Sequence, residues 1–311
     1  MKKKSVVFTT IAIMLVGAIL ITFAIEINYK YKKEMQVVEM KVDVMNNFIK
    51  DFRDDMERGV YIVGFRSILA LDNYIVQNGL FIDDLSARFS EAMINGTING
   101  NFSDLLNASS FADWTAKIKE QAGTIGININ FTRQDVAIYQ QNPWEIVVNI
   151  NLTYTVTDWQ KTAVWNKTES ITAKIPVEGF EDPLYALASY GKVPNKIIRS
   201  NYTDFSDLNN LIIHLNNSYY IESTTAPSFL MRLEGNLSNS SQGIESLVNL
   251  DEFILQGIPQ KSRSSVDYIY FGNDTINSCI VNETYSSYPW FRLDNDAEPN
   301  NHIDEYEVNC N

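Results

Sequence analysis

The sequence predicts an α+β fold: a long N-terminal transmembrane-plus-stalk helix, a helical subregion, an antiparallel β-sheet and a mixed α/β C-terminal part. Three observations predict this order. Residues 5–58 carry a helical pattern without a break, residues 127–177 alternate polar and apolar side chains, and the rest of the chain mixes both patterns. The predicted divisions are 1–25 (cytoplasmic tail and transmembrane anchor), 26–58 (helical stalk), 59–178 (helices packed on an antiparallel sheet) and 179–311 (mixed α/β part with a disulfide-closed tail).

An uncharged segment follows three lysines at the N-terminus. It runs from Ser5 to Ile25, 21 residues, whereas a signal peptide has an apolar region of about 7–15 residues and a membrane-spanning helix needs about 20. We therefore predict a retained anchor, although the small residues Thr22 and Ala24 also fit a cleavage pattern. Lysines before a first span stay cytoplasmic. The N-terminus is thus predicted to lie in the cytoplasm, and the bulk of the chain to lie outside the cell.

After the span, apolar residues recur at alternating spacings of four and three. This 3.5-residue repeat is typical of a coiled-coil seam, and residues 5–58 are predicted to form one continuous helix, about 80 Å long. The stalk is predicted to end at Gly59. Two roles of the seam stay open: packing on the chain's own domain, or association with a second copy or an envelope protein. The seam consists of Tyr31, Met35, Val38, Val42, Met45, Ile49, Phe52 and Met56.

Beyond the stalk the patterns are shorter. Helices are predicted within 60–76, 80–96, 104–123, 205–215 and 243–257, strands between 127 and 177 and within 226–235 and 264–272, and a turn or loop at 179–185. The clearest strand is 144–156, where Ile146, Val148, Ile150 and Leu152 alternate with polar residues. These four side chains are predicted to face a core that includes the helix at 60–76, while Asn149 and Asn151 face water.

The charge balance is strongly acidic. The chain has 25 basic and 38 acidic residues, a net charge of −13, and residues 59–311 alone hold 15 basic and 30 acidic residues, a net charge of −15. Such a surface repels nucleic acid and anionic lipid surfaces. Nucleic acid is therefore not an expected partner, and the membrane is expected to be contacted through residues 5–25.

Twelve Asn-x-Ser/Thr sequences begin after residue 94, and none begins before it. Asn130, Asn151 and Asn166 occupy polar positions of predicted strands, which fits an exported, glycosylated surface. The alternative is an Asn-rich surface that is never modified. The predicted acceptors are Asn95, Asn101, Asn107, Asn130, Asn151, Asn166, Asn201, Asn216, Asn236, Asn239, Asn273 and Asn282.

The only two cysteines, Cys279 and Cys310, are predicted to form a disulfide that closes the tail of an exported chain. Within this tail, oxygen-bearing side chains have the spacing of a calcium loop, with His302 at its ninth position. Pro299 stands where such a loop needs glycine, so a looser calcium site and a plain solvated acidic loop are alternatives. The candidate calcium ligands are Asp294, Asp296, Glu298, Asn300 and Glu305.

Catalytic motifs are missing from the sequence. It has two histidines, His214 and His302, and no HExxH, GxSxG, GxGxxG, CxxC or phosphate-binding Gly-Lys-Ser/Thr motif. We therefore predict no catalytic residue and no cofactor other than the candidate calcium ion, and we expect His214 to be a hydrogen-bonded histidine of a helix.

Two resemblances bear on function. The stretches GFRSILAL, NPWEIVV, GFEDPLY, PSFLMRLEG, GIESLVN and SSVDYIYF resemble an uncharacterised archaeal family of membrane-anchored surface proteins. Residues 1–58 resemble archaeal type IV pilins and pilin-like proteins, which implies processing near Ser5 and burial of the helix in a filament core or the membrane. The acid common near the start of processed pilin helices is absent, since the first is Glu26. An anchor that never polymerises is equally consistent.

These observations predict a single-pass, externally facing surface glycoprotein with a structural or interaction role, such as a pilin-like or other envelope-assembly component. The alternative from a different class is a membrane-tethered enzyme that acts on envelope polymers.

Overall fold

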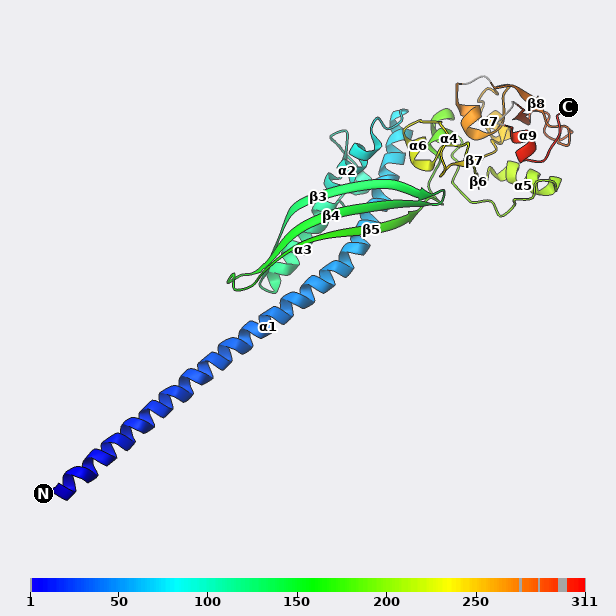
Figure 1. The fold of residues 1–311 in the computed structure, drawn as a ribbon. Coiled ribbons are helices and arrows are strands. Elements are labelled where there is room, and N and C mark those ends of the chain that lie inside the picture. Colours follow the sequence, from blue (N-terminus) through cyan, green and yellow to red (C-terminus); the bar gives the residue numbers. More distant parts are fainter. Residues whose placement is uncertain (1, 274–275, 285, 296–300, 311) are drawn as a thin grey trace. The chain divides into compact units, whose positions relative to one another are not determined.

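The computed structural model describes residues 2–273, 276–284, 286–295 and 301–310 (Figure 1). The fold is α+β, as predicted, with a long N-terminal helix and small antiparallel sheets. By contacts the chain divides into two compact units. Unit 1 comprises Met1–Asp55, Ile118–Thr132 and Tyr154–Lys167, and unit 2 comprises Met56–Lys117, Arg133–Thr153 and Thr168–Asn311.

Helix α1 covers Lys2–Asn78, 77 residues without a break. The predicted continuous helix over residues 5–58 is confirmed, but its predicted end at Gly59 is wrong. A glycine within a helix costs only about 1 kcal/mol relative to alanine, and Gly59 has a packing role. A Cβ atom there would lie 3.2 Å from the ring of Trp114. The helix ends instead at Gly79, which takes a positive φ of 67°, the usual left-handed termination of a helix.

Three strands form the main sheet: β3 (Ile127–Asn142), β4 (Glu145–Asp158) and β5 (Val164–Pro176) lie side by side in this order (Figure 1). Their long alternating patterns explain why they were predictable. In the unit 2 part of β4, Ile146, Val148, Ile150 and Leu152 are fully buried and Asn151 is exposed. Asn149 is half-buried, and its side-chain NH2 group donates to the hydroxyl oxygens of one serine and one threonine of β5, Ser170 and Thr172.

The predicted partner of this strand is also confirmed. A Cβ atom at Gly64 of α1 would lie 3.1 Å from Cδ1 of Ile175 and 3.3 Å from Cγ2 of Val148. The lack of a side chain at Gly64 therefore lets helix and sheet approach closely within unit 2.

In unit 1, the second half of the predicted seam packs on the chain's own strands. Met45 and Phe52 are buried, and the ring of Phe52 lies 5.0 Å from that of Tyr154 and 5.9 Å from that of Phe131, centroid to centroid. Among the described residues, nothing covers the first half of the seam in this way. Tyr31, Met35 and Val38 are 66%, 73% and 48% exposed. The interpretation as an amphipathic helix on its own domain thus holds for the later seam residues.

The other elements belong to unit 2, apart from α3, which is shared between the two units, and most are short. Three two-stranded antiparallel sheets pair β1 with β2, β6 with β7 and β8 with β9. The bounds are α2 Leu85–Asn95, β1 Thr97–Ile98, β2 Asn101–Phe102, η1 Asp104–Leu106, α3 Phe111–Thr124, α4 Pro183–Ala188, α5 Leu208–Asn217, β6 Tyr220–Glu222, α6 Phe229–Leu233, β7 Ile244–Ser246, α7 Leu250–Leu255, α8 Asp267–Phe271, β8 Ser278–Ile280, β9 Arg292–Asp294 and α9 His302–Glu305.

Several short elements differ from the prediction. The predicted strands within 226–235 and 264–272 are the helices α6 and α8, because a short apolar run does not distinguish a strand from a helix by periodicity. The predicted helix within 243–257 is divided into β7 and α7. The predicted loop at 179–185 contains the start of α4, where the Asp182 carboxylate accepts the backbone N–H of Leu184 at 2.9 Å.

Candidate functional site

The most apolar surface of the described chain lies on α1. One helix there is long and apolar enough to cross a membrane, within Phe8–Asn78, and none of its most apolar window is buried. Phe8, Leu20 and Ile25 are 79%, 63% and 63% exposed. Exposed apolar side chains on a helix whose backbone hydrogen bonds are all internal suit a lipid environment. This helix is a candidate membrane span.

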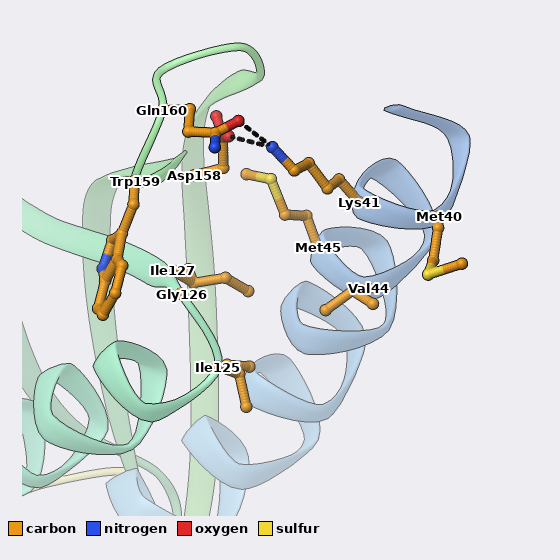
Figure 2. Close-up of a pocket in the computed structure, with 10 residues that line it drawn as sticks. All are labelled: Met40, Lys41, Val44, Met45, Ile125, Gly126, Ile127, Asp158, Trp159 and Gln160. Carbon is orange, nitrogen blue, oxygen red and sulfur yellow. Dashed lines mark hydrogen bonds and ion pairs between the residues drawn. The ribbon is translucent and has the colours of Figure 1, made fainter. Parts of the chain in front are cut away.

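A recess in unit 1 lies between α1 residues 40–45 and the turns at 125–127 and 158–160 (Figure 2). It has a volume of about 290 Å³ and a mainly apolar lining. At its polar end, Nζ of Lys41 lies 3.5 Å from Oδ2 of Asp158. Backbone N–H groups of Ala163 and Thr162 also donate to Asp158. These bonds, that from Ala163 foremost, lower the pKa of Asp158 to about 2.

The rim of this recess is exposed and apolar. Met40 and Trp159 are 66% and 71% exposed, and Ile125 is 52% exposed. A large exposed indole beside aliphatic side chains is typical of a contact surface rather than of a solvated one. The recess carries no cluster of acid, base and nucleophile among its lining residues.

The twelve predicted glycan acceptors can each be placed on the structure. All twelve asparagines are exposed. Among asparagines outside the motif, Asn149, Asn195 and Asn249 are half-buried and use their side-chain amides in hydrogen bonds, whereas others, such as Asn99 and Asn217, are exposed as well. The three strand positions, Asn130, Asn151 and Asn166, lie on exposed faces as predicted. Whether the acceptors carry glycans stays a prediction.

The predicted disulfide is confirmed. Cys279 and Cys310 are bonded, with their Cα atoms 5.5 Å apart. Cys279 lies in β8, and Cys310 pairs with Val281 just after that strand. The bond therefore ties the end of the chain to the small β8–β9 sheet.

The candidate calcium ligands separate into different environments. Asp296, Glu298 and Asn300 lie outside the described residues, so the calcium site stays a prediction. Asp294 is not part of a solvated loop: it is fully buried at the end of β9. Both of its carboxylate oxygens are already in use, because Oδ1 accepts from the Ser264 hydroxyl at 2.7 Å and Oδ2 lies 2.6 Å from Nδ1 of His302.

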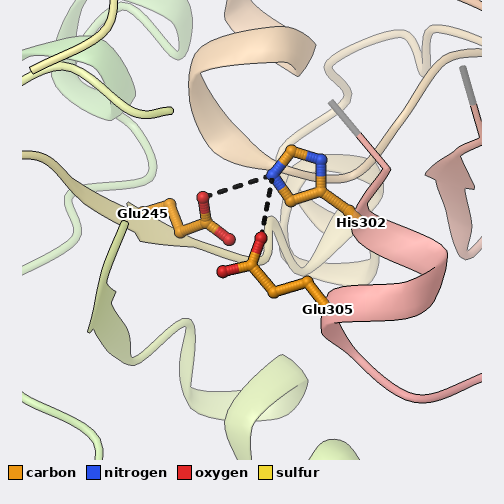
Figure 3. A group of neighbouring side chains, drawn as sticks. All are labelled: Glu245, His302 and Glu305. Carbon is orange, nitrogen blue, oxygen red and sulfur yellow. Dashed lines mark hydrogen bonds and ion pairs between the residues drawn. The ribbon is translucent and has the colours of Figure 1, made fainter. Parts of the chain in front are cut away.

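His302 is the centre of a buried polar cluster that the sequence did not predict (Figure 3). Its Nε2 lies 3.3 Å from Oε2 of Glu245 in β7 and 3.8 Å from Oε2 of Glu305, one turn along α9. The hydroxyl of Tyr306 donates to Oε1 of Glu245 at 3.1 Å, and that of Tyr268 lies 3.4 Å from Nε2. His302 and Glu245 are buried, whereas the side chain of Glu305 is 38% exposed.

The electrostatics of this cluster are dominated by carboxylates. Burial lowers the pKa of His302, but the charge of Glu245 and the hydrogen bonds to Asp294 and Glu245 outweigh it and raise the pKa to about 11. Burial and the charge of Glu245 raise the pKa of Glu305 to about 7. The cluster thus combines a charged or metal-binding imidazole with three carboxyl groups, and its only partly exposed member is Glu305.

A second buried network surrounds Arg232, which is fully buried in α6. Its guanidinium group donates to the carboxylates of Asp182 and Asp267 and to the backbone carbonyl of Ile244. The arginine inside the apolar run PSFLMRLEG was the one signal for this network, and sequence reasoning missed it. Because all three charged groups are buried and paired, we interpret this network as structural.

His214 lies in helix α5, as predicted, and is fully buried. Its Nδ1 is 3.3 Å from the Ser200 hydroxyl. Burial lowers the pKa of His214 to about 4, so the imidazole is neutral at physiological pH.

Comparison with known proteins adds no assignment to this geometry: no protein family, curated protein or solved structure matches the chain.

Proposed function

We propose that the chain is a single-pass surface glycoprotein, anchored in the cell membrane through residues 5–25, with its N-terminus in the cytoplasm and its bulk outside. The exposure of all twelve acceptor asparagines carries this proposal. A glycan can be attached only where the asparagine amide reaches solvent, and all twelve asparagines meet this requirement. The resemblance to archaeal membrane-anchored surface proteins agrees with it.

Three further features support an external location. The apolar half of α1 is exposed along the candidate span. A structural disulfide closes the C-terminal tail, and such bonds persist in oxidising surroundings. The net charge of −15 over residues 59–311 keeps the outer part soluble beside an anionic membrane.

We assign this glycoprotein a structural or interaction role, such as that of a pilin-like or other envelope-assembly component. Within unit 1, no described residue covers two apolar surfaces: the stalk face, formed by Tyr31, Met35 and Val38, and the recess described above. Association of the stalk face with a second copy or an envelope protein would bury it. The alternative enzyme function has no specific observation in its favour, and we do not propose it.

The location is tested on the protein purified from its native membranes. Mass spectrometry of peptides that contain the twelve asparagines is expected to find glycans on several of them. Protease added to intact cells is expected to remove an epitope tag placed after residue 311 but not one placed before residue 2. A protected C-terminal tag, or unmodified asparagines throughout, would contradict the proposal.

The interaction role is tested by cysteine cross-linking in the same membranes. Met35→Cys places a thiol on the stalk face, and Gln36→Cys is the matched control, because successive residues of a helix point about 100° apart. Both positions are exposed, so neither change disturbs the fold. We expect cross-linked species from Met35→Cys and few from Gln36→Cys. Equal yields from the two variants would show that the stalk face has no specific partner.

A further inference from the structure

Three side chains of unit 2 converge on one point. Glu245 comes from β7, and His302 and Glu305 come from α9. Their nearest nitrogen and oxygen atoms all lie within 4.8 Å of one another. Figure 3 shows both carboxylates directed at the same ring nitrogen of His302, Nε2.

The separations in this cluster exceed those of ordinary ion-pair hydrogen bonds. A charged N–H to carboxylate bond is usually about 2.7–2.9 Å long, whereas Nε2 lies 3.3 Å from Glu245 and 3.8 Å from Glu305. Two ligands of a tetrahedral zinc ion, each about 2.0–2.1 Å from the metal, are ~3.3 Å apart. The separation between Nε2 and Glu245 therefore equals that between two zinc ligands, and the partly exposed Glu305 side chain would have to move closer to complete the set.

The opposite side of the imidazole is held as in metal sites. Nδ1 of His302 lies 2.6 Å from Oδ2 of Asp294, and the other oxygen of that carboxylate accepts from Ser264. A metal-binding histidine commonly donates its second N–H to a buried carboxylate, which fixes the ring and directs the other nitrogen at the metal. Asp294 thus supports the site from the second layer, instead of being a ligand itself.

The charge of the cluster is also unbalanced. Glu245, Asp294 and Glu305 bring three carboxyl groups to one imidazole, and Glu245 and Asp294 are fully buried. Even a protonated imidazole would balance only one of the two fully buried carboxylates, Glu245 and Asp294. A divalent cation would supply the missing positive charge, and buried carboxylates without such compensation are costly.

The geometry points to a binding site for one divalent transition-metal ion, with Nε2 of His302 and one carboxylate oxygen each from Glu245 and Glu305 as ligands. One imidazole nitrogen with two carboxylate oxygens suits zinc or manganese, whereas calcium takes six to eight oxygen ligands. The metal replaces the proton on Nε2, which passes to solvent. Glu305 is the partly exposed ligand, so the ion enters from its side and water completes the coordination there.

The site would act as a structural link. It joins the tail helix α9, inside the segment closed by the Cys279–Cys310 bond, to strand β7, which lies outside that segment. Metal and disulfide would then attach the C-terminal end of the tail to two different strands, β7 and β8. This inference is independent of the membrane topology and glycosylation proposed above.

The test uses the full chain, purified in detergent, stripped with EDTA and dialysed. Zn²⁺ titration by calorimetry is expected to show one ion per chain and a thermal midpoint that rises with the metal concentration. Glu305→Gln is expected to weaken the affinity at least tenfold, and the control Glu307→Gln, an exposed glutamate two residues along, to leave it unchanged. Absorption of the Co²⁺-loaded protein is expected to report a four-coordinate site.

Clear outcomes would overturn the inference. They are the absence of saturable Zn²⁺ binding by the unmutated chain, equal affinity in Glu305→Gln, or an equal loss in Glu307→Gln. Each would leave His302 as a buried imidazolium ion pair or the metal as an ion of the acidic surface. Displacement of Zn²⁺ by an equal concentration of Ca²⁺ would also overturn it, because a nitrogen-containing site should reject calcium. The stoichiometry of the unmutated chain is informative even if a variant fails to fold.

Discussion

Replacing Asp72 with asparagine is expected to stabilise the protein at neutral pH. Asp72 lies in α1 within unit 2 and is only 3% exposed. Its Oδ1 has no hydrogen-bond partner among the described residues. Burial, together with the charges of Glu181 and Asp182, raises the pKa of Asp72 to about 8. The folded chain therefore keeps this carboxyl group protonated at pH 7.

The size of the effect follows from the two pKa values. The unfolded chain titrates Asp72 near pH 3.8 and the folded chain near pH 8. Between these values the folded state binds the extra proton, so the stability that Asp72 contributes is fully present below pH 3.8 and is lost as pH rises to 8. At pH 7 the difference of about three pKa units corresponds to about 4 kcal/mol, at about 1.4 kcal/mol per unit. Asparagine is neutral in both states and avoids this loss.

The assay is urea unfolding of the full chain in detergent, followed by tryptophan fluorescence at pH 5, 6, 7 and 8. The unmutated protein is expected to lose stability across this range, and Asp72→Asn to lose much less. Asp54→Asn, an exposed site in the same helix, is the matched control and should follow the unmutated protein. A variant that is less stable at pH 7 and keeps the same pH dependence would refute the reasoning.

Two further predictions concern buried and covalent links of unit 2. Arg232→Met leaves the buried carboxylates of Asp182 and Asp267 without a cation, so urea unfolding should show a loss of about 3–5 kcal/mol. Adding Asp182→Asn and Asp267→Asn should restore at least half of it, and no recovery would contradict the ion-pair argument. The double change Cys279→Ser and Cys310→Ser opens a link between residues 31 apart, which should cost about 4 kcal/mol. Unfolding midpoints that match those of the disulfide-bonded chain would contradict this value.

The parts of the fold with long periodic patterns were predictable from sequence. The alternation through Ile146 and Leu152 gave the correct buried face of β4, because a strand with one covered face places every second side chain in the core. The unbroken helix was predictable because apolar side chains recur along it every 3.5 residues on average. The end of the helix was not predictable. A glycine usually marks a helix end in sequence, but Gly59 lies inside the helix, where its lack of a side chain makes room for the ring of Trp114.

The short elements of unit 2 were predicted poorly because capping decides them. At α6, the Ser228 hydroxyl accepts the backbone N–H of Met231. At α4, Asp182 has the same role immediately before Pro183. These capping residues were present in the sequence. A run of five or six apolar residues is nevertheless too short for its periodicity to distinguish a helix from a strand.

The candidate sites show the same limit at longer range. The disulfide was predictable because the chain offers only one pair of cysteines. The His302 cluster was not predictable, because Glu245 lies 57 residues away from His302 in sequence and no local motif connects the two residues. Asp294 and Glu305 were correctly selected as oxygen-rich positions, but strand β9 buries Asp294 under the imidazole instead of leaving it in a calcium loop.

The seam of α1 shows why a heptad pattern cannot by itself identify a partner. Met45 and Phe52 are buried within unit 1, whereas Tyr31, Met35 and Val38 are exposed. These three residues cover little more than one heptad, and a coiled coil in water needs about three or four. The stalk face is therefore too short to hold two copies together alone. It can act only where the adjoining spans keep the helices parallel and at high local concentration in the bilayer, which is why the cross-linking comparison at Met35 must be made in native membranes.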